Sequence, residues 1–163
     1  MMKAPGILKT MLILFLVNYL ESFTAPSLLK IYVAVPLTFI VFSALAYRSS
    51  QNINPFYALS IGLFVDLISN SLFGLNAILF CLISYVINSY SNTFKLFSYL
   101  QVCIFFGAAS VFFTGLSNLF LAIENFSYII LFVSFFFNTS LCFLVALSPL
   151  NKLSIDKRLS QYD

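Results

Sequence analysis

The sequence of 163 residues contains few charged side chains, and it contains no histidine and no tryptophan at all. Charged residues make up 8% of the chain, whereas a soluble domain carries about 25%, because its surface must face water. The chain therefore has too few charges to cover a soluble globule. Hydrophobic residues make up 61% and the mean hydropathy is +1.02, which is typical of a protein that lies in lipid.

The missing histidine also limits the chemistry of the chain. Histidine is the commonest proton shuttle and metal ligand, so a nucleophile–histidine pair is excluded within this sequence. The three cysteines lie in apolar runs without CxxC spacing, and we interpret them as small core residues: Cys81, Cys103 and Cys142. No cluster of basic residues suggests nucleic acid. We expect no enzymatic activity, no metal and no cofactor.

The hydrophobic runs predict an all-α integral membrane protein with six transmembrane helices. A spanning helix needs about 20 residues, so six helices occupy a single domain at 1–150 and leave a short cytoplasmic tail at 151–163. The expected spans are 7–20, 28–47, 56–68, 72–90, 96–123 and 126–147. We expect Glu21 in the first loop, a kink at Pro36 inside the second helix, and a polar turn at 91–95.

The distribution of basic residues predicts the orientation. Lys and Arg are retained on the cytoplasmic side during insertion. With the N-terminus in the cytoplasm, the cytoplasmic segments contain Lys3, Lys9, Arg48, Lys95, Lys152, Lys157 and Arg158. The outer segments contain only Lys30, together with Glu21 and Glu124. The sequence thus predicts a multi-pass protein of the bacterial inner membrane with both termini in the cytoplasm.

Small and weakly polar residues recur at helical spacing in three of the expected spans. Such residues let membrane helices approach one another closely. The stripes are Ala77, Cys81, Ser84 and Asn88; Gly107, Ser110, Thr114 and Ser117; and Ser134 with Asn138. We interpret them as helix-packing surfaces, and a ligand cavity lined by the same residues is the alternative. Runs such as Phe135-Phe136-Phe137 suit contact with lipid or with a partner helix.

Asp66 is the one ionisable residue expected at membrane depth. A carboxylate there costs about 2.5–3.5 kcal/mol on insertion scales, unless it is protonated, paired or bonded to backbone N–H groups. The segment 69–71 can supply such donors, and the carboxylate can cap a helix that begins near Leu72. Three interpretations remain open: a structural turn, a partner-binding site, and a site that handles a proton or a substrate.

At this segment the chain resembles the rod shape-determining protein MreD family, which shows a glycine one turn before an Asp-Leu-x-Ser/Thr-Gly step. The matching residues are Gly62, Asp66, Leu67, Ser69, Gly74, Asn76 and Ala77. Asn70 stands where the family often has glycine, and Leu72 where many members have proline. Asn tolerates positive φ better than most residues, so we include Asn70 in the expected turn.

The resemblance implies a non-enzymatic scaffold of the bacterial rod complex, which directs lateral peptidoglycan synthesis and cell shape. The implied partners are MreC above all, with RodA, a class B penicillin-binding protein, MreB and RodZ, besides membrane lipid. It also implies a helix arrangement similar to the S components of energy-coupling factor transporters. A solute-binding component of a transporter is the alternative. An intramembrane enzyme would need several clustered ionisable residues, and only Asp66 qualifies.

Overall fold

The structure is a computed structural model that describes residues 7–48, 54–69, 73–121 and 127–147. These residues form seven helices and no strand, which confirms the expected all-α class. The helices are α1 (Ile7–Leu29), α2 (Leu37–Arg48), α3 (Pro55–Ser69), α4 (Leu75–Ser89), α5 (Ser91–Leu96), α6 (Tyr99–Leu121) and α7 (Tyr128–Leu147).

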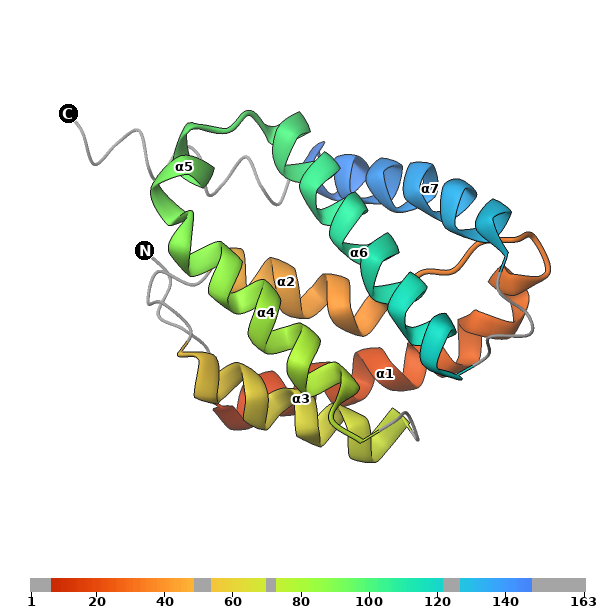
Figure 1. Cartoon of the computed structure of the whole chain (residues 1–163), viewed down its shortest axis with the longest axis horizontal. Coiled ribbons are helices and arrows are strands. Elements are labelled where there is room, and N and C mark those ends of the chain that lie inside the picture. Colours follow the sequence, from red (N-terminus) through yellow and green to blue (C-terminus); the bar gives the residue numbers. More distant parts are fainter. Residues whose placement is uncertain (1–6, 49–53, 70–72, 122–126, 148–163) are drawn as a thin grey trace.

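The helices pack as two pairs with α1 and α2 alongside them (Figure 1). The most extensive contacts join α3 to α4 and α6 to α7. The helix α2 touches α1, α4 and α6, so it lies at the centre of the molecule. The short helix α5 connects α4 to α6 at one corner (Figure 1).

The core where these helices meet is rich in aromatic rings. Phe42 of α2 stacks on Phe80 of α4 with ring centroids 4.2 Å apart, and Phe39 stacks on Phe113 of α6 at 4.7 Å. Stacked aromatic pairs contribute about 0.5–1.5 kcal/mol beyond the area that they bury. The core cluster consists of Leu14, Phe39, Phe42, Ala46, Ala58, Ile61, Val65, Phe80, Ile83, Ile87, Phe94, Val102 and Phe106.

The outer surface of the helices is also apolar. Leu8, Phe23, Phe56 and Tyr128 are each 78–80% exposed, and soluble monomers rarely expose large continuous apolar patches. Two segments are long and apolar enough to cross a membrane, Leu8–Leu29 and Leu100–Phe120. The remaining apolar helices are shorter, at 10–17 residues: Leu37–Tyr47, Pro55–Ser69, Leu75–Ser89 and Tyr128–Phe143.

The first two expected spans have the wrong boundaries. The helix α1 continues through Glu21 to Leu29, so Glu21 lies inside a helix and not in a loop. Pro36 comes directly before α2, so it does not kink that helix. Instead the chain turns at Tyr32, which has a φ of 58°, and the backbone N–H of Val33 bonds the carbonyl of Leu28 at 3.1 Å. A left-handed residue of this kind ends a helix and satisfies its last carbonyls.

Two other connections also differ from the expectation. The segment expected as a polar turn at 91–95 is helical, as α5. The helix expected to begin near Leu72 begins at Leu75, after Gly74 in the left-handed conformation with a φ of 97°. The start of α3 follows ordinary capping rules: Pro55 is its first residue, and the side-chain oxygen of Asn54 accepts the N–H of Phe56 at 3.3 Å.

Candidate functional site

The carboxylate of Asp66 closes the connection between α3 and α4. It is 3% exposed and accepts three backbone N–H bonds from the start of α4. Oδ2 accepts from Gly74 at 2.8 Å and from Ala77 at 3.3 Å, while Oδ1 accepts from Asn76 at 3.0 Å. The first N–H groups of a helix lack partners within the helix, and a negative charge there also interacts favourably with the helix dipole. Asp66 therefore acts as an N-cap supplied by the preceding helix.

Glycine is required at two positions of this connection. A Cβ at Gly62 would collide with the backbone Cα of Ala77 and would lie 2.7 Å from its nitrogen, so α3 and α4 touch backbone to backbone here. Gly74 has open space around it, but its positive φ is strained for residues that carry a Cβ. Asp66, Gly62 and Gly74 together position the start of α4 against α3.

The remaining residues of the expected turn lie in different surroundings. Leu67 is 68% exposed and points away from the core, whereas Asn76 is 5% exposed. Ser69 is half-buried at the end of α3. Asn70 lies outside the described residues. The donors to Asp66 in the structure are thus backbone groups of 74–77, beyond the 69–71 segment from which the sequence led us to expect them.

Glu21 serves α2 in the same way, and sequence reasoning missed this role. Its Oε2 accepts the backbone N–H of Thr38 at 2.7 Å and the Thr38 hydroxyl at 2.5 Å. Thr38 is the second residue of α2, so a carboxylate from within α1 caps the start of α2. The available signal was the Pro36-Leu37-Thr38 step, because proline is common where a helix starts.

Glu21 also lines a small polar cavity of about 130 Å³ between five helices. The lining residues are Asn18 and Glu21 of α1, Thr38 of α2, Val65 and Ser69 of α3, Leu75 and Asn76 of α4, and Phe113 and Ser117 of α6. Asp66 caps α4 beside this cavity but is not among the lining residues. The cavity gathers polar side chains that are far apart in the sequence.

A second polar network fastens the non-helical segment before α2 to α7. The Ser134 hydroxyl accepts the backbone N–H of Ala34 at 2.8 Å, and the Asn138 amide donates to the carbonyl of Ala34 at 3.3 Å. The same amide donates to the Ser110 hydroxyl of α6 at 2.9 Å. Among the described residues, the side-chain oxygen of Asn138 is the one buried side-chain polar atom without a partner.

The structure places the proposed helix-packing residues mostly inside the bundle. Ala77, Ser84, Gly107, Ser110, Thr114, Ser134 and Asn138 are buried, and Cys81, Asn88 and Ser117 are half-buried. A Cβ at Gly107 would collide with the Thr139 hydroxyl, so α6 and α7 also approach closely. All three cysteines are free thiols.

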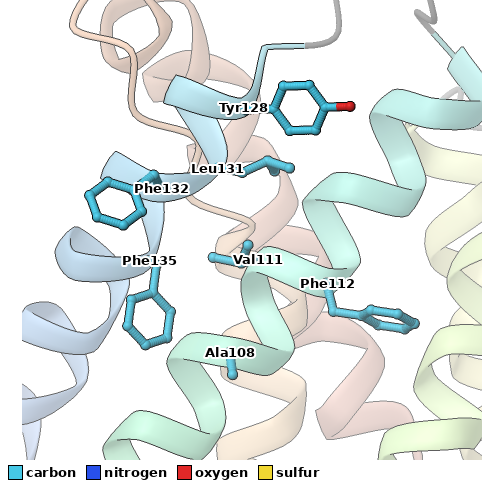
Figure 2. Close-up of a pocket in the computed structure, with 7 residues that line it drawn as sticks. All are labelled: Ala108, Val111, Phe112, Tyr128, Leu131, Phe132 and Phe135. Carbon is cyan, nitrogen blue, oxygen red and sulfur yellow. The ribbon is translucent and has the colours of Figure 1, made fainter.

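An apolar groove of about 490 Å³ lies between α6 and α7. Its lining residues are Ala108, Val111, Phe112, Tyr128, Leu131, Phe132 and Phe135. In Figure 2, Val111 and Leu131 lie toward each other between the two helices, whereas Phe112 points away from α7. The groove is open at the surface of the molecule.

Comparison with protein-family models, with curated proteins and with solved structures found no match. In the described part of the chain, no group of three or more His, Cys, Asp or Glu residues could hold a metal ion. The geometry assigns both Asp66 and Glu21 to helix capping. It also provides one polar cavity and one apolar groove as places where another molecule can bind.

Proposed function

We propose that this chain is a non-enzymatic membrane scaffold of the bacterial rod complex, which spans the inner membrane six times and docks MreC. The spans would be α1, α2, α3, α4, α6 and α7, with both termini in the cytoplasm. RodA, a class B penicillin-binding protein, MreB and RodZ belong to the same proposed complex. The resemblance to the MreD family supplies these partners.

The hydrogen bonds of the non-helical backbone at 33–36 support the membrane part of the proposal. The helix α2 has 12 residues, which is about 18 Å at 1.5 Å per residue and too short to cross about 30 Å of hydrocarbon alone. The segment before it must therefore lie at membrane depth, where unpaired backbone groups are costly. Ser134 and Asn138 bind both backbone groups of Ala34, as such a broken span requires.

The positions of the basic residues support the proposed orientation. Thr10 and Tyr57 are bonded at 2.9 Å, and the rings of Tyr47 and Phe94 are 5.9 Å apart. The first contact joins the start of α1 to the start of α3, the second joins the end of α2 to α5, and all four segments lie at the same end of the bundle (Figure 1). Lys9, Arg48 and Lys95 belong to that end, whereas Lys30 follows α1 at the other end.

The proposed role in the rod complex rests mainly on one observation, the structure of the α3–α4 connection. The residues on which the resemblance to MreD rests are the ones that close this connection: Gly62 contacts Ala77, Asp66 caps α4, and Gly74 takes the left-handed turn. A shared motif that performs a specific structural task is better support than shared composition. In this proposal the turn is a structural element, and the exposed phenylalanines of α7 receive the partner helix.

The test is depletion of the protein in its rod-shaped host, together with purification of the tagged protein from its own membranes. We expect depleted cells to become round and MreC to co-purify. Phe132→Ala, in the α6–α7 groove, should reduce the amount of MreC recovered. Phe23→Ala, at an exposed position of α1 outside the groove (79% exposed, against 68% for Phe132), is the matched control. Rods that persist after depletion and a purification without MreC would together contradict the proposal.

A solute-binding component of a transporter is the second candidate, and the polar cavity between five helices favours it only for a small solute. Pockets for drug-sized ligands have volumes of about 300–1,000 Å³, so a cavity of about 130 Å³ is too small for a vitamin-sized solute. A solute that stays bound through purification, in a host whose shape does not depend on the protein, would support this candidate over the scaffold.

A further inference from the structure

We propose that the polar cavity between α1, α2, α3, α4 and α6 binds a small monovalent cation. This inference does not depend on the scaffold role, because it rests on the side chains that line the cavity. The polar lining residues are Asn18, Glu21, Thr38, Ser69, Asn76 and Ser117.

The volume of the cavity limits its occupant. About 130 Å³ corresponds to roughly four water molecules at about 30 Å³ each. A sodium or potassium ion with a few waters fits this space, and so does an ammonium ion. Larger organic cations do not.

The charge of the lining selects a monovalent ion. Glu21 is the one carboxylate in the lining, and the other polar groups are neutral hydroxyls and amides. Hard cations prefer such oxygen ligands, and one negative charge balances one positive charge. No Lys or Arg forms an ion pair with Glu21 within the part of the chain that the structure describes, so a bound cation would be the partner of its carboxylate.

One of the two carboxylate oxygens of Glu21 takes no part in the capping of α2. Both hydrogen bonds from Thr38 go to Oε2, and Oε1 forms no hydrogen bond with a described residue. Capping of α2 therefore uses half of the carboxylate. The other half is free to bind a cation at the edge of the cavity.

Asn18 adds an amide oxygen to the lining. Its side chain is 7% exposed and forms no hydrogen bond with another described residue, whereas Asn138 donates its amide to Ala34 and Ser110. The amide oxygen of Asn18 can therefore bind the cation directly or through a water.

The test measures the thermal unfolding of the purified full-length protein in detergent, in salts of equal ionic strength. Sodium, potassium and ammonium chloride are compared with N-methyl-D-glucamine chloride, whose cation is too large for the cavity. A ligand that binds the folded state raises the Tm, and we expect a rise of about 4 °C in at least one of the three small-cation salts. Glu21→Gln should abolish this rise, because glutamine still accepts the bonds from Thr38 but carries no charge.

Ser60→Ala is the matched control, since Ser60 is exposed and bonds only the carbonyl of Phe56 in its own helix. It should keep the full cation-dependent rise. Equal Tm values in all four salts, or a Glu21→Gln variant that keeps the rise, would overturn the proposal. If Glu21→Gln does not fold, Ser117→Ala takes its place. Its half-maximal cation concentration should increase at least about threefold, and an unchanged value would overturn the proposal as well.

Discussion

Glu21 and Asp66 perform the same task at two places in the bundle. Each lies in one helix and accepts hydrogen bonds from the start of the next helix: the N–H and hydroxyl of Thr38 for Glu21, and three backbone N–H groups for Asp66. An ordinary N-cap residue satisfies its own helix, whereas these two carboxylates also tie together helices α1 and α2, or α3 and α4. In this chain, which has few charged residues, these two carboxylates connect neighbouring helices through hydrogen bonds.

Replacing Asp66 by Asn should destabilise the protein by about 2–3 kcal/mol, because a hydrogen bond to a charged group is lost. The amide oxygen can still accept N–H groups, but the amide nitrogen would face a donor at the start of α4. Thermal unfolding of the purified variant measures the effect. A variant with unchanged stability but lost function would instead indicate that the carboxylate has a chemical role.

Gly62→Ala should destabilise the protein by about 1–3 kcal/mol, the usual cost of overpacking. The added methyl group meets the backbone of Ala77 and not a movable side chain, so α3 and α4 must separate. Gly115→Ala is the control, since its Cβ would meet only Leu131 methyl groups at 3.7 and 3.8 Å. The control should be neutral or slightly stabilising, because alanine favours helix. Equal stability of the two variants would argue against a close α3–α4 contact.

At the scale of the element, the non-helical segment before α2 is held by side chains of α7. Ser134→Ala removes the acceptor for the Ala34 N–H, and a buried donor left without a partner costs about 1–3 kcal/mol. Hydrogen exchange is the most direct measurement: the Ala34 amide should lose protection in Ser134→Ala. Ser140→Ala, at an exposed position of the same helix, should leave it protected. Unchanged exchange in Ser134→Ala would mean that α7 does not hold this segment.

The sequence predicted the helical class and singled out Asp66, because hydropathy and an isolated charge are local signals. It did not predict the path from Glu21 to Leu37. We expected Glu21 in a loop because the first hydrophobic run ends near Leu20, but Glu21 lies inside α1 and Thr38, 17 positions later, supplies its two donors. The hydrogen bond between Ser134 and Ala34 joins residues that are 100 positions apart in the sequence. Contacts between residues so far apart depend on tertiary packing, and the periodicity of the sequence does not predict them.

At the scale of the whole molecule, apolar side chains form both the core and much of the outer surface, and several hydroxyl groups are buried between the helices. Ser43, Ser84, Ser110 and Ser134 are at most 1% exposed, while large apolar side chains cover the outer faces of every long helix. This arrangement suits lipid as the solvent. In the proposed membrane topology, the basic residues at the helix ends determine which way the bundle faces.

The orientation is tested most directly by thiol labelling of single-cysteine variants in intact cells. Cys81, Cys103 and Cys142 are first replaced by serine or alanine, and then Lys30→Cys and Lys9→Cys are made separately. A membrane-impermeant maleimide should label Lys30→Cys from outside, and should label Lys9→Cys only after the cells are permeabilised. Labelling of both variants in intact cells, or of Lys9→Cys alone, would contradict a membrane bundle with its N-terminus in the cytoplasm.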